Sequence, residues 1–197
     1  MREEQQQSDV PARRREPRRD ALDNRDRVLA AAAVAVRREG TAVPMATIAA
    51  DAGVGVGTVY RHYPSREALL NALTHRSLRL VVAAAERAAS HDGPGIECVR
   101  SFLHQSIEHG TELVLPMHGG PALPDEEALA LRADIRRTLT SILKRGERDG
   151  TIRSDATSAD IVIFGAMITQ PLPHIANWKT TALRQVVIYL DGLSPRS

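Results

Sequence analysis

The chain has 197 residues, which suits one large domain or two small ones, and its formal net charge at pH 7 is only +2. Hydrophobic residues make up 43% of the chain and charged residues 25%, as in ordinary soluble globular proteins, whereas aromatic residues make up only 3%. This balance excludes a protein that binds nucleic acid through its overall charge, and no apolar run approaches the ~20 residues that a membrane span needs.

The residue types favour helices over strands. With so few aromatic residues, the core has to be built mainly from Ala, Leu, Val and Ile, and alanine-rich stretches favour helix. Cys98 is the only cysteine, which excludes an intrachain disulfide, and the polar start lacks the apolar segment of a secretory signal. We therefore expect an all-α protein that is cytoplasmic and does not enter a membrane.

Residues 1–22 are polar and charged, contain Pro11 and Pro17, and are predicted to form a disordered basic arm. Two interpretations of this arm remain open. It is either a solvated tail, or some of its arginines contact phosphates or the minor groove of DNA beside a recognition helix, as other basic arms do. The arginines in question are Arg13, Arg14, Arg15, Arg18 and Arg19.

A first amphipathic helix is predicted from Asn24 to Glu39, and Gly40 follows in the position that commonly ends a helix. Its apolar residues recur at helical spacing, so that they form one face that packs across the next two helices. These residues are Val28, Leu29, Ala32, Ala33 and Val36.

The stretch from Met45 to Tyr63 has the pattern of two short helices joined by a tight turn. Ile48 and Ala52 lie at helical spacing, Gly53 interrupts the pattern with a residue that adopts positive φ at little cost, and Val56 opens a second helix. Such a helix-turn-helix places its second helix in the major groove of DNA.

The second of these helices carries side chains that suit nucleic acid. Gly57 and Thr58 at its start leave room for a close approach of the backbone to DNA. The residues that end it offer hydroxyl, guanidinium and imidazole groups to phosphates and base edges: Tyr60, Arg61, His62 and Tyr63. The alternative is a purely structural hairpin, but such a hairpin has no reason to crowd these side chains on a short, largely exposed helix.

Residues 25–73 resemble the DNA-binding domain of the TetR family of bacterial repressors. The resemblance rests on Ile48-Ala49, on Ala52-Gly53-Val54, and on the run GTVYRHYP at 57–64 with SREAL after it. It implies a three-helix helix-turn-helix domain at 23–72 and a C-terminal helical bundle at 73–197 for ligand binding and dimerisation. The DNA-contacting residues that we expect on this basis are Thr47, Val56, Gly57, Thr58, Tyr60, Arg61, His62, Tyr63 and Arg66.

One departure from the family concerns the start of the second helix. Family members often carry Ser or Thr there as an N-cap. Here Pro44 lies near that point, which suits the first helical turn but removes the capping hydroxyl. We expect the helix to form nevertheless.

The remainder of the chain is predicted to be helical. Ser65 is a good N-cap for a helix that runs to about Ala89, and the residues HDGPG at 91–95 break the pattern. Further helices are predicted at 96–110, 125–148, from a capping box at 157–160 onward, and at 178–191 with Gly192 as the stop, whereas 111–123 is irregular. The 125–148 helix is expected to turn inward Leu129, Leu131, Ile135, Leu139, Ile142 and Leu143.

No strong catalytic motif is present, and we expect no catalytic residue, no cofactor and no metal. His104 and Glu108 lie four residues apart on one predicted helix with His109 adjacent, but a structural zinc site needs about four ligands. The rival class is an enzyme or ligand carrier that retains a helix-turn-helix as a remnant. A mobility shift on DNA from the promoter region nearest its gene discriminates between the two.

A pocket for a small molecule is expected among the C-terminal helices, and the resemblance also implies one. The candidate lining mixes apolar side chains with one amide. The alternative is that the apolar members simply fill the core. The candidates are Phe102, Met117, Phe164, Met167, Gln170 and Trp178.

The last two predicted helices carry more apolar surface than one bundle needs, which favours a four-helix seam with a second copy. The candidate interface residues are Ile161, Phe164, Ile168, Leu183, Val186, Val187 and Leu190. Packing within one chain is the competing explanation. The overall prediction is a sequence-specific, homodimeric transcriptional regulator that a small-molecule effector releases from a palindromic double-stranded DNA operator, and repression is the default that the resemblance implies.

Overall fold

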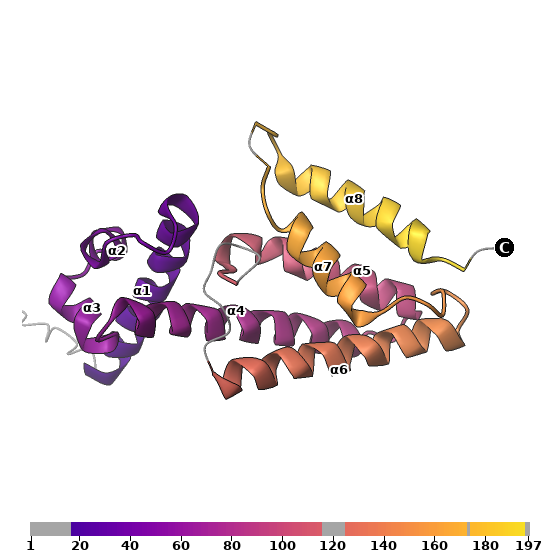
Figure 1. Ribbon diagram of the computed structural model, residues 1–197, viewed down its shortest axis with the longest axis horizontal. Helices are drawn as coiled ribbons and strands as arrows, with labels where there is room; N and C mark the ends of the chain where they lie inside the picture. Colours follow the sequence, from indigo (N-terminus) through magenta and orange to yellow (C-terminus); the bar gives the residue numbers. More distant parts are fainter. Residues whose placement is uncertain (1–16, 116–124, 173, 196–197) are drawn as a thin grey trace, which may run out of the picture.

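The computed structural model describes residues 17–115, 125–172 and 174–195, with side chains from Asn24 onward. Over this part of the chain the regular elements are all helical, as predicted (Figure 1). In chain order they are α1 (Pro17–Glu39), α2 (Met45–Ala52), α3 (Val56–His62), α4 (Arg66–Ala89), α5 (Gly95–Glu108), the short 3-10 helix η1 (Gly110–Glu112), α6 (Glu126–Arg148), α7 (Ser158–Ile168) and α8 (Trp178–Leu193).

Two hydrophobic cores organise these helices. An N-terminal core joins α1, α2, α3 and the start of α4, and a C-terminal core joins the remainder of α4 to α5, α6, α7 and α8. The long helix α4 extends from one body into the other (Figure 1). It contributes Leu69 and Leu73 to the N-terminal core and Leu78 and Ala85 to the C-terminal core. A displacement of α4 therefore moves both bodies.

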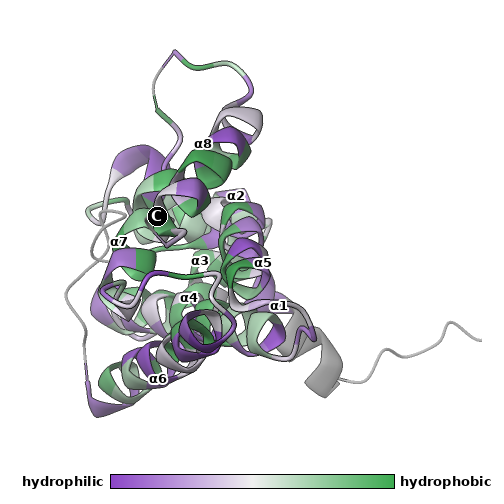
Figure 2. Ribbon diagram, turned by 90° about the vertical axis from the view of Figure 1, so that its right-hand side faces the viewer, coloured by the Kyte–Doolittle hydropathy of each residue, from purple (hydrophilic) through white to green (hydrophobic). Residues whose placement is uncertain are grey.

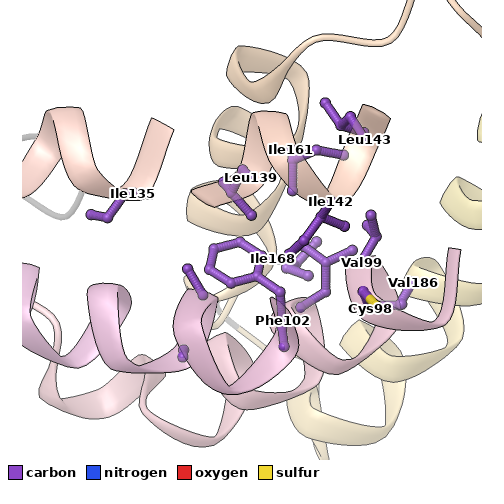
Figure 3. Packing of buried hydrophobic residues seen from close by; sticks show 14 of the residues in the cluster. Cys98, Val99, Phe102, Ile135, Leu139, Ile142, Leu143, Ile161, Ile168 and Val186 are labelled. Atoms are coloured by element: carbon purple, nitrogen blue, oxygen red, sulfur yellow. The ribbon is translucent and has the colours of Figure 1, made fainter. Parts of the chain in front are cut away.

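Amphipathic helices account for this packing. Seen end on, the helices carry apolar and polar stretches side by side, as expected when one face is buried against neighbours (Figure 2). In the C-terminal core, Phe102 of α5 lies among buried side chains of α6 and α7, including Leu139, Ile142 and Ile168 (Figure 3). None of the described helices has a stretch long and apolar enough to cross a membrane.

The helices α4 and α7 begin with the predicted caps. Ser65 caps α4 by accepting a hydrogen bond from the Ala68 amide at 3.1 Å, and Thr157 and Asp160 form the predicted capping box of α7. Pro44 precedes α2 without a side-chain cap, and its carbonyl accepts bonds from the amides of Thr47 and Ile48. The loss of a capping hydroxyl therefore does not prevent the helix.

Three expectations about the helices were wrong. Helix α1 begins at Pro17 rather than Asn24, because proline is favourable in a first helical turn and good helix formers follow it; residues 1–16 of the expected arm lie outside the described part. Gly192 does not stop α8, which continues to Leu193. Leu129 is 55% exposed, because the adjacent Ala128 holds the buried position at the start of α6.

The break at 91–95 is stabilised by contacts across the bundle. Arg145 of α6 donates to the carbonyls of His91 and Ala89 at 2.6 and 3.1 Å, which satisfies acceptors at the end of α4. Helices α5 and α6 approach so closely here that a Cβ on Gly95 would lie 2.2 Å from the Gly146 amide nitrogen. Glycine at 95 is therefore a packing requirement.

Candidate nucleic-acid interface

The turn between α2 and α3 has the geometry that the glycine pattern predicted. Gly53 ends α2 with φ +64°, in the left-handed region, and Val54 packs partly buried against the N-terminal core. Arg27 of α1 completes the turn, because its Nη2 donates to the carbonyl oxygens of Ala52 at 2.7 Å and Gly53 at 3.4 Å. The positive guanidinium thus lies at the negative end of the α2 dipole.

Helix α3 presents one face to the outside of the protein. Val56 and Tyr60, four residues apart, are 44% and 50% exposed, although both are large apolar side chains. Gly57 lies between them, and a Cβ built there meets no atom within 4 Å. This face of α3 is therefore uncovered, and a large binding partner can approach its backbone closely.

The polar groups on α3 are held along the helix in the free protein. Arg61 donates from Nε to the carbonyl oxygen of Gly57 at 3.2 Å and from Nη2 to Thr58 Oγ1 at 3.1 Å. Because Arg61 is exposed, these bonds exchange readily for bonds to an incoming phosphate or base. The guanidinium is therefore oriented by Thr58 before any ligand arrives.

The opposite face of α3 anchors the helix. Val59 is fully buried, and Tyr63 is only 3% exposed, so the expectation that Tyr63 is displayed on an exposed helix was wrong. The Tyr63 hydroxyl accepts a bond from Arg25 Nε at 3.3 Å, and burial raises the pKa of this hydroxyl. Its aromatic ring fills the core because it follows Val59 by one helical turn.

The other predicted contact residues flank this face. Thr47 of α2 and His62 of α3 are half-buried, and the His62 ring is tilted against Tyr63 with ring centroids 6.4 Å apart. Arg66 is exposed in the first turn of α4. Periodicity did not identify Arg25 and Arg27, because their partners at Tyr63 and Ala52 are distant in the sequence.

The C-terminal bundle encloses a small, mostly apolar cavity of about 60 Å³. Of the predicted pocket residues that the structure describes, Phe102 alone lines it. Phe164 is stacked on Tyr189, Met167 is 61% exposed, and Trp178 donates from Nε1 to the Ile168 carbonyl at 2.9 Å. Gln170 is half-buried, and Met117 lies outside the described residues. The lining residues are Val81, Phe102, Ser106, Leu113, Leu115, Val162, Gly165, Ala166 and Thr169.

The predicted interface residues divide between two environments. Ile161, Ile168, Val186 and Leu190 are buried in the core of their own chain, so the competing explanation holds for them. Phe164 and Leu183 are half-buried against the same core. The exposed apolar side chains of α7 and α8, called here the α7/α8 surface, are Ile163, Met167, Val187 and Ile188.

The weak metal candidate has other partners. Glu108 pairs with Lys179 at 2.6 Å, and burial together with the nearby Arg100 lowers the pKa of His104. His109 instead faces Glu112 at 3.1 Å. Over the described stretches, no group of three or more His, Cys, Asp or Glu side chains is arranged to hold a metal ion.

An exposed helix-turn-helix joined to a larger helical bundle is the architecture of a DNA-binding regulator. The chain belongs to the TetR family of bacterial regulatory proteins, whose family model matches residues 28–73. It is 32% identical over 130 residues to the HTH-type transcriptional repressor LfrR of Mycolicibacterium smegmatis, an alignment that covers 66% of this chain and 68% of LfrR.

Solved structures agree with this assignment. A TetR transcription regulatory protein from Mycobacterium vanbaalenii is 31% identical and superposes with a TM-score of 0.64, over 90% of this chain and 99% of that one. AibR, solved in complex with isovaleryl coenzyme A and operator DNA, has the same fold at 17% identity, with a TM-score of 0.67 over 89% of this chain and all of AibR (100%).

Proposed function

We propose that this protein is a homodimeric, cytoplasmic repressor that binds a palindromic operator and leaves it when a small molecule occupies the C-terminal bundle. The observation that carries the proposal is the open face of α3, where Val56, Gly57 and Tyr60 are uncovered although two of them are apolar. These residues lie on the second helix of the helix-turn-helix, which is the helix that enters the major groove of DNA in this motif.

The side chains of this face suit different parts of DNA. Gly57 admits the backbone closely, Thr58 and Tyr60 supply hydroxyl groups, and Val56 is suited to contact a thymine methyl group. Arg61 reaches phosphate or guanine once it leaves Thr58, and Arg66 reaches phosphate from the start of α4. Thr47 and His62 support these contacts from the edges. Tyr63 acts indirectly, since its buried ring positions α3.

Similar proteins and thermodynamic linkage both support repression and its release by a ligand. LfrR is a transcriptional repressor, and AibR, which has the same fold, was solved in complex with isovaleryl coenzyme A and operator DNA; both support the proposal. A ligand releases the operator only if it binds the DNA-incompetent state more tightly than the DNA-competent state. The bundle cavity is the place where such a ligand acts in this proposal.

A binding selection tests the DNA-binding proposal. Randomised duplexes are incubated with the purified full chain, the bound fraction is amplified and sequenced, and the recovered motif is measured by fluorescence anisotropy. We expect an inverted repeat, and we expect Tyr60→Ala to weaken binding to it at least tenfold while helical content is unchanged. Val34→Ala is a matched control, because Val34 is a similarly exposed apolar residue on α1, outside helix α3. Recovery of no motif by the full chain would contradict the proposal.

A further inference from the structure

One exposed face of α6 concentrates positive charge. Between Arg132 and Arg148 every exposed residue is polar or charged, and five of these residues are cations against one carboxylate, Glu147. The net charge of the whole chain is only +2, so this excess is local. The five cations, called here the α6 basic face, are Arg132, Arg136, Arg137, Lys144 and Arg148.

Most of these cations have no carboxylate partner. Arg137 pairs with Asp134, whereas the other four form no ion pair with any residue that the structure describes. Elsewhere on the bundle, Arg79 and Lys179 are also exposed, but each pairs with a carboxylate, at 2.5 and 2.6 Å. The charges of the α6 basic face are therefore available to an external anion.

Stabilisation of α6 itself explains only the last cations of the face. Positive side chains near the C-terminus of a helix interact favourably with its dipole, and the effect falls off within the last turn. Arg148 lies in that turn, and its Nε donates to the Lys144 carbonyl at 3.1 Å. Arg132 and Arg136 lie in the first half of the helix, so the dipole does not account for them.

The composition of the face favours a nucleic-acid backbone over a protein or a membrane. Protein interfaces have an apolar core, and helices that lie on membranes insert apolar side chains. Leu129 is a large exposed apolar residue of α6, but it lies one turn before the face, whose residues are all described and include no exposed apolar side chain. Phosphate contacts need only suitably spaced cations. The face extends for about 24 Å along the helix, the length of about seven base pairs of DNA.

Two shallow depressions on this face suit individual phosphates, because each brings two cations together. The first is lined by Ala133, Arg136, Arg137, Thr140 and Ser158. The second is lined by Ser141, Lys144, Glu147 and Arg148. The hydroxyls of Thr140 and Ser141 already donate to carbonyls of α6, at 2.8 and 2.7 Å. The cations therefore supply the donors for a phosphate.

The position of α6 keeps this face uncovered and directs it away from α3. Figures 1 and 2 both place α6 on the side of the bundle opposite α8, so a dimer formed through the α7/α8 surface leaves the face open. Asp125, which caps α6, contacts His75 partway along α4 at 2.9 Å, whereas Arg145 near the other end donates to Ala89 at the end of α4. DNA bound to α3 reaches this face only through a sharp bend, which costs free energy. A separate DNA segment fits better.

We propose that the α6 basic face binds the phosphate backbone of a second segment of double-stranded DNA, without reading its sequence. This site goes beyond the proposed function, because it does not involve α3. Phosphate contacts carry no sequence information and release counterions, so the binding is non-specific and weakens steeply with salt. A protein that holds its operator through α3 thereby captures another segment of DNA and bridges the two.

Removing cations from the face tests the proposal on a labelled duplex that carries no inverted repeat. The background is the full chain with Tyr60→Ala, Arg61→Ala and Arg66→Ala, which removes contacts proposed for the operator. In this background, Arg136→Gln with Lys144→Gln should weaken binding at low salt at least tenfold and flatten the slope of log affinity against log salt by about 1.8, or about 0.9 for each phosphate. Fluorescence anisotropy measures both quantities.

The matched control removes the same charge outside the face. Arg79→Gln with Lys179→Gln in the same background takes away two exposed cations, and we expect little loss of affinity and an unchanged slope. Equal losses in the two double variants would overturn the proposal, because binding would then depend on overall charge. Phosphatidylserine vesicles replace the duplex in a further measurement. Vesicle binding that is lost in the face variant, with duplex binding unchanged, would overturn DNA in favour of a membrane.

A capture experiment tests bridging directly. Wild-type protein that saturates an immobilised duplex with the selected operator motif should retain a second, labelled duplex. Arg136→Gln with Lys144→Gln should hold the first duplex equally well and retain little of the second. A wild type that holds the first duplex but captures no second one would overturn bridging. If no operator motif is recovered, the anisotropy measurement still decides this proposal, because its background lacks the α3 contacts.

Discussion

Arg27 of α1 donates a hydrogen bond of 2.7 Å to the carbonyl oxygen of Ala52, the last residue of α2. This contact joins the supporting helix to the turn of the helix-turn-helix. A charge-assisted bond to carbonyls at a helix end adds to the favourable charge at the negative end of the dipole. Arg27 therefore stabilises the angle at which α3 leaves the turn.

Replacing Arg27 by Ala is expected to lower the free energy of unfolding by about 1 kcal/mol. Urea unfolding followed by circular dichroism measures the loss. Arg38→Ala is the control, because Arg38 also links α1 to α2, through Asp51 at 3.1 Å, but as an exposed ion pair. Exposed ion pairs contribute about 0–1 kcal/mol. Equal losses in the two variants would contradict the special role of Arg27.

Gly57→Ala is expected to separate stability from DNA affinity. Alanine is a better helix former than glycine, and the added Cβ meets no atom within 4 Å, so unfolding should cost about 0.5–1 kcal/mol more. The same methyl group occupies the face that approaches DNA, so affinity should fall. Thermal unfolding and anisotropy on the selected motif check the two effects. A variant with higher stability and unchanged affinity would show that Gly57 does not face DNA.

The arginines that precede α1 give a salt-dependent prediction. Log affinity falls with log salt by about 0.9 for each phosphate that the protein neutralises. Deleting residues 1–16 leaves α1 complete and should flatten that slope by about 0.9 for every arginine of the arm that engages a phosphate. Changing Glu3 and Glu4 to Gln controls for altered charge without removing cations. An unchanged slope after the deletion would identify the arm as a solvated tail.

The capping box of α7 predicts a pH dependence. Hydrogen bonds from the Thr157 side chain and amide lower the pKa of Asp160 below its usual 3.8. A lowered folded-state pKa means that the stabilisation is present above the unfolded pKa and disappears as pH falls through the folded value. The difference in unfolding free energy between wild type and Asp160→Asn should therefore be largest near neutral pH and shrink below 3.8. A constant difference from pH 7 to the lowest pH tested would contradict this assignment.

Local sequence signals predicted the helices well, but they did not predict contacts between residues that are far apart in the sequence. The caps at Ser65 and Thr157 and the turn at Gly53 depend on neighbouring residues, so the sequence states them directly. The exposed side of α3 was also predicted, apart from Tyr63. That ring belongs to the N-terminal core, and its hydroxyl accepts a bond from Arg25, a residue distant in the sequence.

The same limit applies to the C-terminal domain. The helices α7 and α8 were predicted to carry more apolar surface than one bundle needs, but Ile161 and Val186 are buried in their own core, whereas Ile163 and Ile188 are exposed. Because both sets are apolar, hydropathy alone does not distinguish the residues buried in their own chain from those that remain exposed. Val114 is the clearest case, since its place in the N-terminal core depends entirely on how a C-terminal segment folds back.

The last prediction concerns assembly through the α7/α8 surface. One recognition helix reads too few base pairs to find a site among the ~10⁶ or more competitors in a genome, whereas a two-fold dimer reads an inverted repeat. Ile163, Met167, Val187 and Ile188 offer exposed apolar area for that dimer, and Val187 is 47% exposed in the single chain.

Val187→Asp should weaken association because it places a charge where we expect the partner chain to pack. Burying one valine side chain contributes about 1.5 kcal/mol or more. A two-fold dimer buries Val187 of both chains, so its dissociation constant should rise about a hundredfold in the variant. Operator affinity should fall with it, although α3 is untouched. Leu129→Asp is the matched control, because Leu129 is a similarly exposed apolar residue on α6. Light scattering at micromolar concentration measures the masses, and a wild type that is a strict monomer yet binds the inverted repeat tightly would disprove the dimer.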